Sequence, residues 1–307
     1  DDALLTIGES AEVTFTFSEQ VKDFTLDDIT VPAGSGAFSG LRTTDEGKTW
    51  TATFTPAADY EGEVEITVAD NSYTDQDGNL GTGLSTTVVV DTMAPTLESI
   101  EWDDALLTIG ESAEVTFTFS EQVKDFTLDD ITVPAGSGAF SGLRTTDEGK
   151  TWTATFTPAA DYEGEVEITV ADNSYTDLDG NPGTGLSTTV VVDTMAPDAP
   201  VAEIDEDGNI ISGTTEPGAT VTVTAENEEV LGTAVAGEDG SYEVELSRSV
   251  TDGEKVNVTA TDEADNKSKP TEVTGAKDTI APTLESIELD DALLTIGESA
   301  EVTFTFS

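Results

Sequence analysis

Apolar and polar residues alternate with a period of two over short stretches of this chain. In Ala113–Ser120, Val115, Phe117 and Phe119 fall on one face, and the threonines between them fall on the other. Such stretches recur about every 8–15 residues, with Gly, Asp and Asn between them, which is typical of an antiparallel sandwich. No stretch shows a convincing helical period. The pattern therefore predicts an all-β protein.

The same alternation predicts about seven strands in each segment of the chain, as in an immunoglobulin-like Greek key. We therefore predict tandem immunoglobulin-like Greek-key β-sandwiches arranged end to end, without the Cys…Trp…Cys pattern of antibody domains. After Ala113–Ser120 the predicted strands are Trp152–Thr157, Glu165–Ala171 and Ser187–Val192, the weaker candidates Phe126–Val133 and Ala139–Arg144, and then Ile210–Thr214, Ala219–Ala225, Val230–Ala236, Ser241–Leu246, Lys255–Thr261 and Thr271–Gly275.

The chain repeats itself almost without change. Residues 1–95 recur as residues 103–197, and the two copies differ only by Gln76 against Leu178 and Leu80 against Pro182. A third copy begins at Asp290, and a different sequence lies between the second and third copies. An Asp-Thr-x-Ala-Pro motif closes each unit, and the unit length fits one small domain rather than one turn of a solenoid.

Four segments follow from this repeat. Residues 1–95 (module one) are predicted to be an immunoglobulin-like domain without its first strand, because they lack the residues that match Thr96–Trp102. Residues 96–197 (module two) are a domain of the same type, and residues 198–282 (module three) are a domain of a second type. Residues 283–307 (the C-terminal segment) start a further module and are too few to bury a core alone. We expect both ends to be boundaries of a piece cut from something longer.

The charge of the chain restricts its partners. It has 64 Asp and Glu against 11 Lys and Arg, a net charge of −53, and no His or Cys. Disulfides and His or Cys zinc sites are therefore excluded, and an acidic surface repels nucleic acid and anionic lipid. The apolar runs are too short to span a bilayer. We expect cations and the neighbouring modules of the same chain as partners, no direct membrane insertion, and a monomer.

Acidic residues gather where consecutive modules should meet. The last strand of a sandwich ends beside the N-terminal loops of the next module, so Asp91 should lie near Glu121 and near the loop of residues 172–181. Carboxylate and amide side chains recur along that loop, and its candidate ligands are Asp172, Asp177, Asp179 and Asn181. Since Ca²⁺ takes about 6–8 oxygen ligands, this composition predicts a Ca²⁺ site, whereas Mg²⁺ would keep its waters.

Module three has the same arrangement in an unrelated sequence. Asp193 ends module two, Glu216 lies in the first apical loop of module three, and Asp262 and Asp265 lie in its last loop. Asp278 closes module three in the same way. Recurrence at the same topological end is the best functional signal in the chain, although Asp-Gly and Asp-Asn loops are also ordinary turns. We expect the acidic pairs at residues 27–28 and 129–130 to be solvated rather than to bind metal.

Modules one and two resemble the bacterial immunoglobulin-like repeats of giant biofilm adhesins, on the motifs SEQVKDFTLDDITV, DYEGEVEITVADNSYTDLDGN and VVVDTMAP. Module three resembles a second type from the same proteins, on SGTTEPGATVTVTA and VNVTATDEADNKS. The resemblance is to RTX, LapA-like adhesins, which Gram-negative bacteria export by a type I system. It implies a cell-surface extender, stiffened by Ca²⁺ near domain junctions, that projects a ligand-binding tip for adhesion and biofilm formation. The junction pattern of the family matches Asp193, Glu216, Asp262 and Asp265 best.

Two other functions are open to this sequence. The first is a carbohydrate- or receptor-binding module that uses exposed aromatics such as Trp102, Trp152 and Tyr175, although Trp50 and Trp152 suit the core of a strand better. The second is an enzyme that uses paired carboxylates. No carboxylate is distinguished as an acid of raised pKa, and duplicated modules argue against a unique active site. We therefore predict a chain that is not an enzyme.

Overall fold

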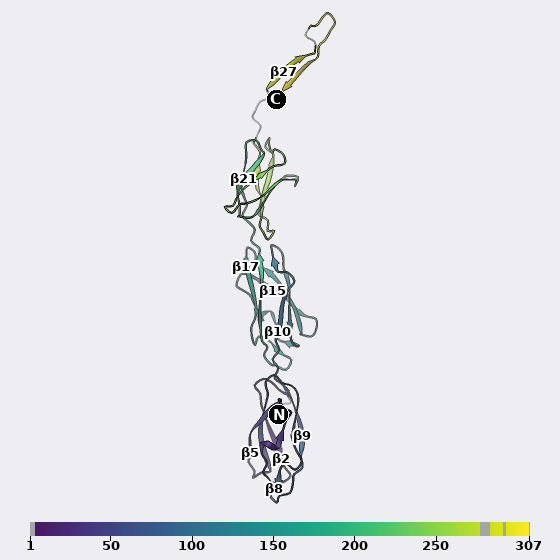
Figure 1. The fold of residues 1–307 in the computed structure, drawn as a ribbon, viewed down its shortest axis with the longest axis vertical. Coiled ribbons are helices and arrows are strands. Elements are labelled where there is room, and N and C mark those ends of the chain that lie inside the picture. The colour runs from purple at the N-terminus through teal and green to yellow at the C-terminus, as the bar shows by residue number, and fades with distance from the viewer. Residues whose placement is uncertain (1–3, 277–282, 291–292, 307) are drawn as a thin grey trace. The chain divides into compact units, whose positions relative to one another are not determined.

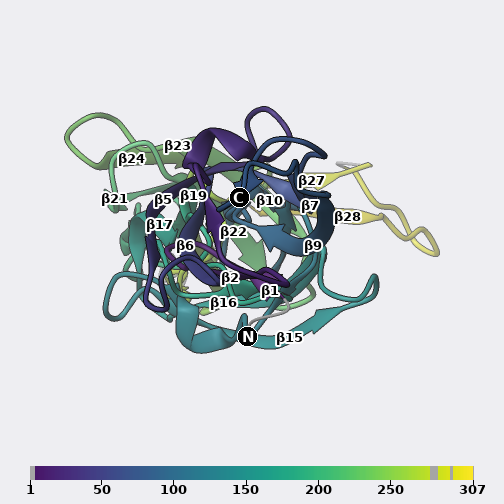
Figure 2. The same cartoon turned by 90° about the horizontal axis from the view of Figure 1, so that it is seen from below.

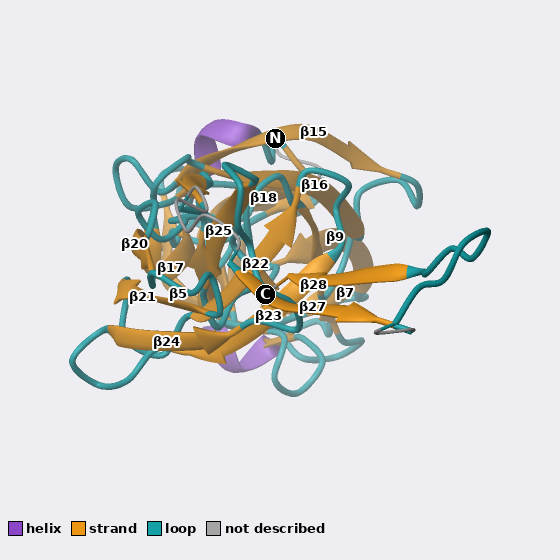
Figure 3. Ribbon diagram, turned by 90° about the horizontal axis from the view of Figure 1, so that it is seen from above, coloured by secondary structure: helices purple, strands orange, loops and turns teal. Residues whose placement is uncertain are grey.

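The computed structural model describes residues 4–276, 283–290 and 293–306 (Figure 1). The backbone divides into two compact units, Asp1–Met195 and Ala196–Ser307, and each is described by itself. Strands make up nearly all the regular structure of the described residues, which contain no α-helix (Figure 3). The only helical turns there are two short 3-10 helices, η1 (Leu26–Asp28) and η2 (Leu128–Asp130). The predicted all-β class is confirmed.

Module two is a sandwich of two four-stranded sheets. One sheet has the order β10-β12-β16-β15, and the other has the order β11-β19-β17-β14. A small ribbon of β13 and β18 joins two loops at one end of the sandwich. The strands are β10 (Leu97–Trp102), β11 (Leu106–Leu107), β12 (Ala113–Phe119), β13 (Val123–Lys124), β14 (Ile131–Thr132), β15 (Gly138–Thr145), β16 (Thr151–Pro158), β17 (Glu163–Val170), β18 (Thr176–Asp177) and β19 (Leu186–Asp193). The strand order is that of an immunoglobulin-like sandwich.

Module one repeats this architecture with one strand fewer among the described residues. Its sheets are β2-β6-β5 and β1-β9-β7-β4, with the ribbon β3-β8, and Figure 2 shows β7 and β9 side by side. No strand takes the position that β10 has in module two. The strands are β1 (Leu4–Leu5), β2 (Ala11–Thr16), β3 (Val21–Lys22), β4 (Ile29–Thr30), β5 (Gly36–Thr43), β6 (Thr49–Pro56), β7 (Glu61–Val68), β8 (Thr74–Asp75) and β9 (Leu84–Asp91).

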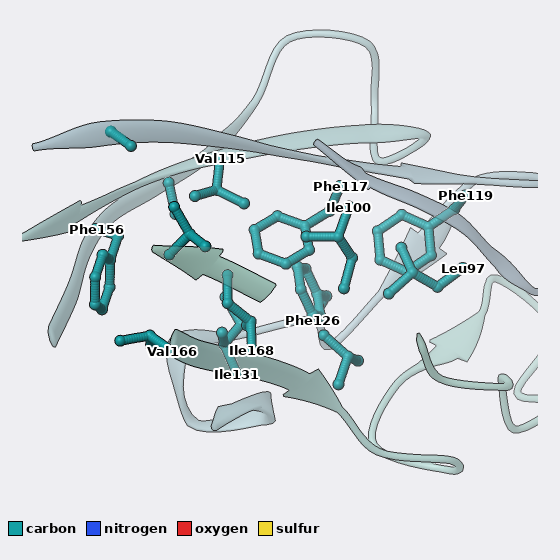
Figure 4. Packing of buried hydrophobic residues seen from close by; sticks show 14 of the residues in the cluster. Leu97, Ile100, Val115, Phe117, Phe119, Phe126, Ile131, Phe156, Val166 and Ile168 are labelled. Atoms are coloured by element: carbon teal, nitrogen blue, oxygen red, sulfur yellow. The ribbon is translucent and has the colours of Figure 1, made fainter. Parts of the chain in front are cut away.

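The core of module two is built from the inward faces of both sheets. Phe117 and Phe119 of β12 are fully buried, and each packs edge-on against Phe126. Strand β10 lies next to β12 in the same sheet and extends this face, with Ile100 beside Phe117 and Leu97 beside Phe119 in the strand register (Figure 4). The period-two alternation of the sequence thus has a direct cause, since the apolar positions of β12 all point between the sheets.

Module three has a three-stranded sheet, β20-β21-β24, and a four-stranded sheet, β23-β22-β25-β26. Its strands are β20 (Val201–Ile204), β21 (Ile210–Thr214), β22 (Thr220–Ala225), β23 (Val230–Val235), β24 (Ser241–Glu245), β25 (Lys255–Thr261) and β26 (Thr271–Thr274). Val221, Val223 and Val258 lie fully buried between the two sheets. In the C-terminal segment, β27 (Leu284–Leu289) and β28 (Val302–Phe306) form an antiparallel hairpin.

The strand predictions agree with the structure to within two residues at each end, with one exception. The predicted strand Phe126–Val133 is wrong over most of its length, because η2 occupies Leu128–Asp130 and only Ile131–Thr132 is extended. The carboxylate of Asp130 accepts hydrogen bonds from the main-chain N–H and the hydroxyl of Thr127, at 2.7 and 2.9 Å. These bonds favour a helical turn over an extended strand. The solvated acidic pair at residues 129–130 therefore lies in this turn, not in a strand.

Candidate metal centre at the junction of modules one and two

The loop between β17 and β19 is organised around one buried carboxylate, that of Asp177. Its Oδ1 accepts hydrogen bonds from the main-chain N–H groups of Asp179, Gly180 and Asn181, at 2.8, 2.6 and 2.8 Å. Its Oδ2 accepts a bond from Asn181 Nδ2 at 2.7 Å. Gly180 has a φ of +103°, a conformation that glycine adopts most readily. The hydrogen bonds that Asp177 accepts therefore stabilise the conformation of this loop without a bound ligand.

Asn181 connects module two to module one. Its side chain is 1% exposed, and its Oδ1 accepts a hydrogen bond from the main-chain N–H of Ile7 at 2.8 Å. Its Nδ2 donates to the main-chain oxygen of Asp91 at 3.1 Å as well as to Asp177. The amide therefore links the two ends of module one to a single loop of module two. In module one the matching residue, Asn79, is exposed and also bonds its own loop aspartate, Asp75.

Five carboxylates lie near this contact, those of Glu61, Asp91, Glu121, Asp177 and Asp179. Asp91 is 7% exposed, and its Oδ1 accepts a bond from the main-chain N–H of Met93 at 3.0 Å. Burial raises the pKa of Asp91, and the nearby carboxylates of Asp177 and Asp179 raise it further. Burial also raises the pKa of Glu121, followed by the charges of Asp177, Asp91, Glu61 and Asp179. Like charges this close favour either a bound proton or a bound cation.

These residues fit a Ca²⁺ ion better than other metals, because they offer only carboxylate and amide oxygen atoms. Among the residues that the structure describes, no three acidic side chains lie close enough together to form a ready-made metal shell. The side chains would have to move toward an ion for three or more of them to bind it. Asp91, Glu121 and Asp179 are the carboxylates that could do so, while Asp177 and Asn181 hold the loop.

The remaining predicted residue of this loop has a different role. The Oδ1 of Asp172 accepts a hydrogen bond from the main-chain N–H of Gly185 at 2.8 Å and so closes the base of the loop. A Cβ on Gly185 would lie 1.9 Å from the oxygen of Val170, so the chain needs glycine there. The sequence analysis missed Ile7 and Glu61 at the junction. Ile7 lies near the start of module one and reaches Asn181, while Glu61 begins β7 and lies opposite Asp91 in the pairing of β7 with β9. Only the folded sandwich brings these residues to the junction.

Module three contains a loop of the same design between β25 and β26. The Oδ1 of Asp262 accepts bonds from the N–H groups of Ala264 and Asn266 at 2.9 and 2.8 Å, and Asn266 Nδ2 bonds its Oδ2 at 3.1 Å. Asp265 takes the left-handed conformation in this turn, with a φ of +64°. Glu216 lies between β21 and β22, which is the predicted apical loop.

Asp193 ends β19 and belongs to the first compact unit, where its Oδ1 accepts a bond from the N–H of Met195 at 3.1 Å. Glu216, Asp262 and Asp265 belong to the second unit. The predicted ligand Asp278 lies outside the described residues.

The aromatic residues proposed for ligand stacking are used inside the sandwich. Tyr175 is buried and donates from its hydroxyl to the main-chain oxygen of Thr184 at 2.5 Å. Trp152 packs edge-on against Phe126, and its indole N–H donates to Gly149 at 3.0 Å. Trp102 packs edge-on against Phe156. The contacts of Trp152 agree with its interpretation as a core residue, whereas Trp102 is partly buried and also lines an open pocket. Within the described part of the chain, no helix is long and apolar enough to cross a membrane.

The tandem organisation is also found by comparison with protein families. A family described as bacterial Ig-like domain matches residues 1–90 and again residues 91–194, and one described as bacterial Ig domain matches residues 196–278. Neither is a catalytic family. No curated protein matches the chain.

Solved structures with a similar course of the chain include several bacterial adhesins. The Escherichia coli adhesin FdeC has 15% identity and a TM-score of 0.36, over 89% of this chain and 93% of that one. InvD of Yersinia pseudotuberculosis has 12% identity and a TM-score of 0.34, over 89% and 96%. Invasin, described as a bacterial integrin-binding protein, has 10% identity and a TM-score of 0.37, over 94% and 60%. These likenesses are too distant to carry an argument about function. The family matches cover well over half of the sequence, and the chain belongs to the bacterial Ig-like domain family.

Proposed function

We propose that this chain is a structural extender of a bacterial cell-surface adhesin of the RTX, LapA-like type, in which Ca²⁺ at the module junctions stiffens the string. The observation that supports this proposal most is the position of Asp91. It ends strand β9 of module one, where burial raises its pKa and the carboxylates of Asp177 and Asp179 in module two raise it further. A divalent cation would stabilise such a junction, because it neutralises carboxylates that repel one another.

The overall charge gives such a cation a mechanical purpose. A chain with a net charge of −53 repels itself along its length, so neighbouring modules separate and bend unless charge is neutralised. Ca²⁺ held between Asp91, Glu121 and Asp179 would reduce this repulsion at the point where the modules meet. Asn181 would then keep the loop in register with module one through its bonds to Ile7 and Asp91.

The proposed location is outside a Gram-negative cell, after export by a type I system. Extracellular modules bind Ca²⁺ with dissociation constants of about 10⁻⁴–10⁻³ M, so external calcium would fill such sites while cytosolic calcium would not. The absence of Cys from the sequence suits a chain exported unfolded and folded in the presence of calcium outside. The ligand of the adhesin would be bound elsewhere in the parent protein.

Small-angle X-ray scattering with Ca²⁺ and then with EGTA tests this proposal. We expect chelation to reduce the maximum dimension and the stiffness of the chain, and Asp179→Asn to reproduce part of this change in the presence of Ca²⁺. The matched control is Asp77→Asn, which alters the same loop of module one, where Asp77 is exposed. Identical profiles with and without Ca²⁺ would contradict the proposal, as would equal effects of the two variants.

A ligand-binding module is the second candidate, and one feature favours it. Module two carries an open pocket of about 410 Å³ beside Glu101, Trp102 and Ala105. Trp102 is one of the aromatic residues expected to stack on a sugar ring. The near-identity of modules one and two suits a spacer better, because a spacer can be copied without loss of function. Glycan-array binding that is lost in Trp102→Ala would favour the second candidate.

A further inference from the structure

Modules one and two differ at two positions only, and both positions lie in the same loop. Module two has Leu178 and Pro182 between β17 and β19, where module one has Gln76 and Leu80. The two differences flank the segment that contains Asn181, which bonds to module one. The sequence of module one is thus a natural reference for what each of the two residues adds to the junction.

The main chain at position 182 accommodates a proline without loss of a bond. Pro182 forms an isolated antiparallel bridge with Thr176. The two main-chain hydrogen bonds of this bridge, at 3.0 and 3.1 Å, are made by the residues on either side of the pair and not by the pair itself. A proline in such a non-hydrogen-bonded pair removes no bond of the ladder. Leu80 forms the same bridge with Thr74 in module one, so proline and leucine both fit this fold.

Pro182 restricts the backbone of Asn181. The ring of a proline clashes with the preceding residue in the helical region and leaves extended conformations to that residue. Asparagine is otherwise common in turns, where its backbone leaves the extended region, as at Asn173 with a φ of +62°. Leucine at position 182 would impose no such limit. Pro182 therefore reduces the number of conformations that Asn181 must lose when the loop takes its folded form.

Asn181 needs one fixed orientation to make its contacts. Its Oδ1 accepts a hydrogen bond from the N–H of Ile7 at 2.8 Å. Its Nδ2 donates to the main-chain oxygen of Asp91 at 3.1 Å and to Asp177 Oδ2 at 2.7 Å. An amide nitrogen has two N–H donors, so both are used. Two of these three bonds cross to module one, and a backbone movement at Asn181 would break them.

We propose that Pro182 is a positioning residue of the junction, which limits Asn181 to the backbone conformation in which its amide binds a preceding module of the same type. The partner groups are the N–H of Ile7 and the oxygen of Asp91, and both belong to the main chain. Recognition therefore depends on where the backbone of module one lies rather than on the chemistry of its side chains. An amide that is held in place before the modules meet loses less conformational freedom on binding them together.

Leu178 differs from Gln76 without such a consequence. Its main-chain oxygen accepts a hydrogen bond from Lys124 Nζ at 2.7 Å, and the oxygen of Gln76 accepts the matching bond from Lys22 Nζ at 3.0 Å. A bond to the main chain does not require a particular side chain at that position. Leu178→Gln is therefore a matched control for Pro182→Leu, because each introduces the residue of module one into the loop of module two.

Hydrogen exchange of the Ile7 amide, followed by NMR on the full chain in EGTA, tests the proposal. Pro182→Leu should speed this exchange by about two- to fivefold, the effect expected when a proline that limits the free conformations is removed. Leu178→Gln should leave the exchange of Ile7 unchanged, and so should Leu80→Pro, which makes the reverse change in module one. An Ile7 amide that exchanges at the same rate in Pro182→Leu would overturn the proposal.

Two further measurements separate positioning from a general stabilisation of module two. The amides of β12 report the stability of that module as a whole. If Pro182→Leu accelerated these amides and not Ile7, the proline would act only within module two, and the proposal would be wrong. In Asn181→Ala the bond to Ile7 is absent, so adding Pro182→Leu should change the exchange of Ile7 no further. A further acceleration would show that Pro182 does not act through Asn181.

The contact of Asn181 with module one is made between protein groups and does not depend on calcium. The exchange measurement in EGTA is therefore independent of the extender proposal. Identical scattering profiles with and without Ca²⁺ would leave the result at Ile7 unaffected, and an unchanged Ile7 amide would leave the calcium experiment unaffected.

Discussion

Asn181 Nδ2 donates a hydrogen bond to the main-chain oxygen of Asp91 across the boundary between two modules, over 3.1 Å. The two residues are 90 positions apart in the sequence, and the same amide also accepts a bond from Ile7. One side chain therefore joins the end of the last strand of module one, the turn between β1 and β2, and the last loop of module two. The junction has polar, directional contacts in addition to its linker.

Asn181→Ala should cost more than Asn79→Ala, although the two residues occupy equivalent loops. Both lose the bond to their own loop aspartate, but only Asn181→Ala also removes the bonds to the Ile7 N–H and to the Asp91 oxygen, the second of which is buried. We expect a difference of about 1–3 kcal/mol in the free energy of unfolding, measured with urea on the full chain. Equal costs would mean that the contact between modules adds nothing to stability.

Asp91→Asn should have effects of opposite sign with and without calcium. Asparagine keeps an Oδ1 that can accept the bond from Met93, while it removes a charge that burial opposes first and that the neighbouring carboxylates oppose further. In EGTA the variant should therefore melt at a higher temperature than the natural chain. In Ca²⁺ it should bind the ion roughly tenfold more weakly, which corresponds to about 1.4 kcal/mol.

Calorimetry in EGTA and in Ca²⁺ checks both expected effects of Asp91→Asn, the higher melting temperature without calcium and the weaker binding of the ion. Asp75→Asn does not serve as a control, since Asp75 accepts several bonds in its own loop. Asp77→Asn is a suitable control, and it should change neither the melting temperature in EGTA nor the affinity for Ca²⁺. Destabilisation by Asp91→Asn in EGTA would show that the carboxylate is held by favourable contacts rather than opposed by its neighbours.

The pH dependence of the junction follows from the raised pKa values of Asp91 and Glu121. An acid with a higher pKa in the folded state opposes folding once it ionises, so stability is lost as the pH rises through the raised value. In EGTA the junction should become more stable as the pH falls from neutrality toward the ordinary pKa values of 3.8 and 4.5. In Ca²⁺ the trend should reverse, because protons compete with the ion.

Thermal unfolding at a series of pH values tests the sign of this effect. The double variant Asp91→Asn/Glu121→Gln should flatten the pH dependence in EGTA and remove the reversal by Ca²⁺. If the natural chain lost stability on acidification in EGTA to the same extent as the double variant, the two groups would not be the source of the effect.

The strands of this protein could be predicted from the sequence because their cause is local. Val115, Phe117 and Phe119 alternate with threonines, and any strand that places them inward produces that pattern. The turn at Leu128–Asp130 could not be predicted this way, since Phe126–Val133 has enough β-branched and apolar residues for a strand. There the carboxylate of Asp130 decided the local structure by bonding to Thr127.

The candidate site was predicted in part for a similar reason. The topology of a sandwich places Asp91 near Glu121 and the loop of residues 172–181, and that topology could be inferred from the strands. The division of roles within the loop could not be inferred, because Asp177, Asp179 and Asn181 look alike in the sequence. Only the folded loop shows that the carboxylate of Asp177 accepts bonds from main-chain N–H groups of the same loop. Only the folded module one brings Ile7 to Asn181.

Modules one and two provide an internal control for the packing of β10. Phe117→Ala and Phe15→Ala make the same change in nearly identical sequences, but Phe117 has Ile100 of β10 beside it and is fully buried, whereas Phe15 is half-buried. Phe117→Ala should cost about 3–5 kcal/mol in the free energy of unfolding. Phe15→Ala should cost clearly less when both variants are measured by calorimetry on the same chain. Equal costs would mean that strand β10 adds nothing to the burial of Phe117.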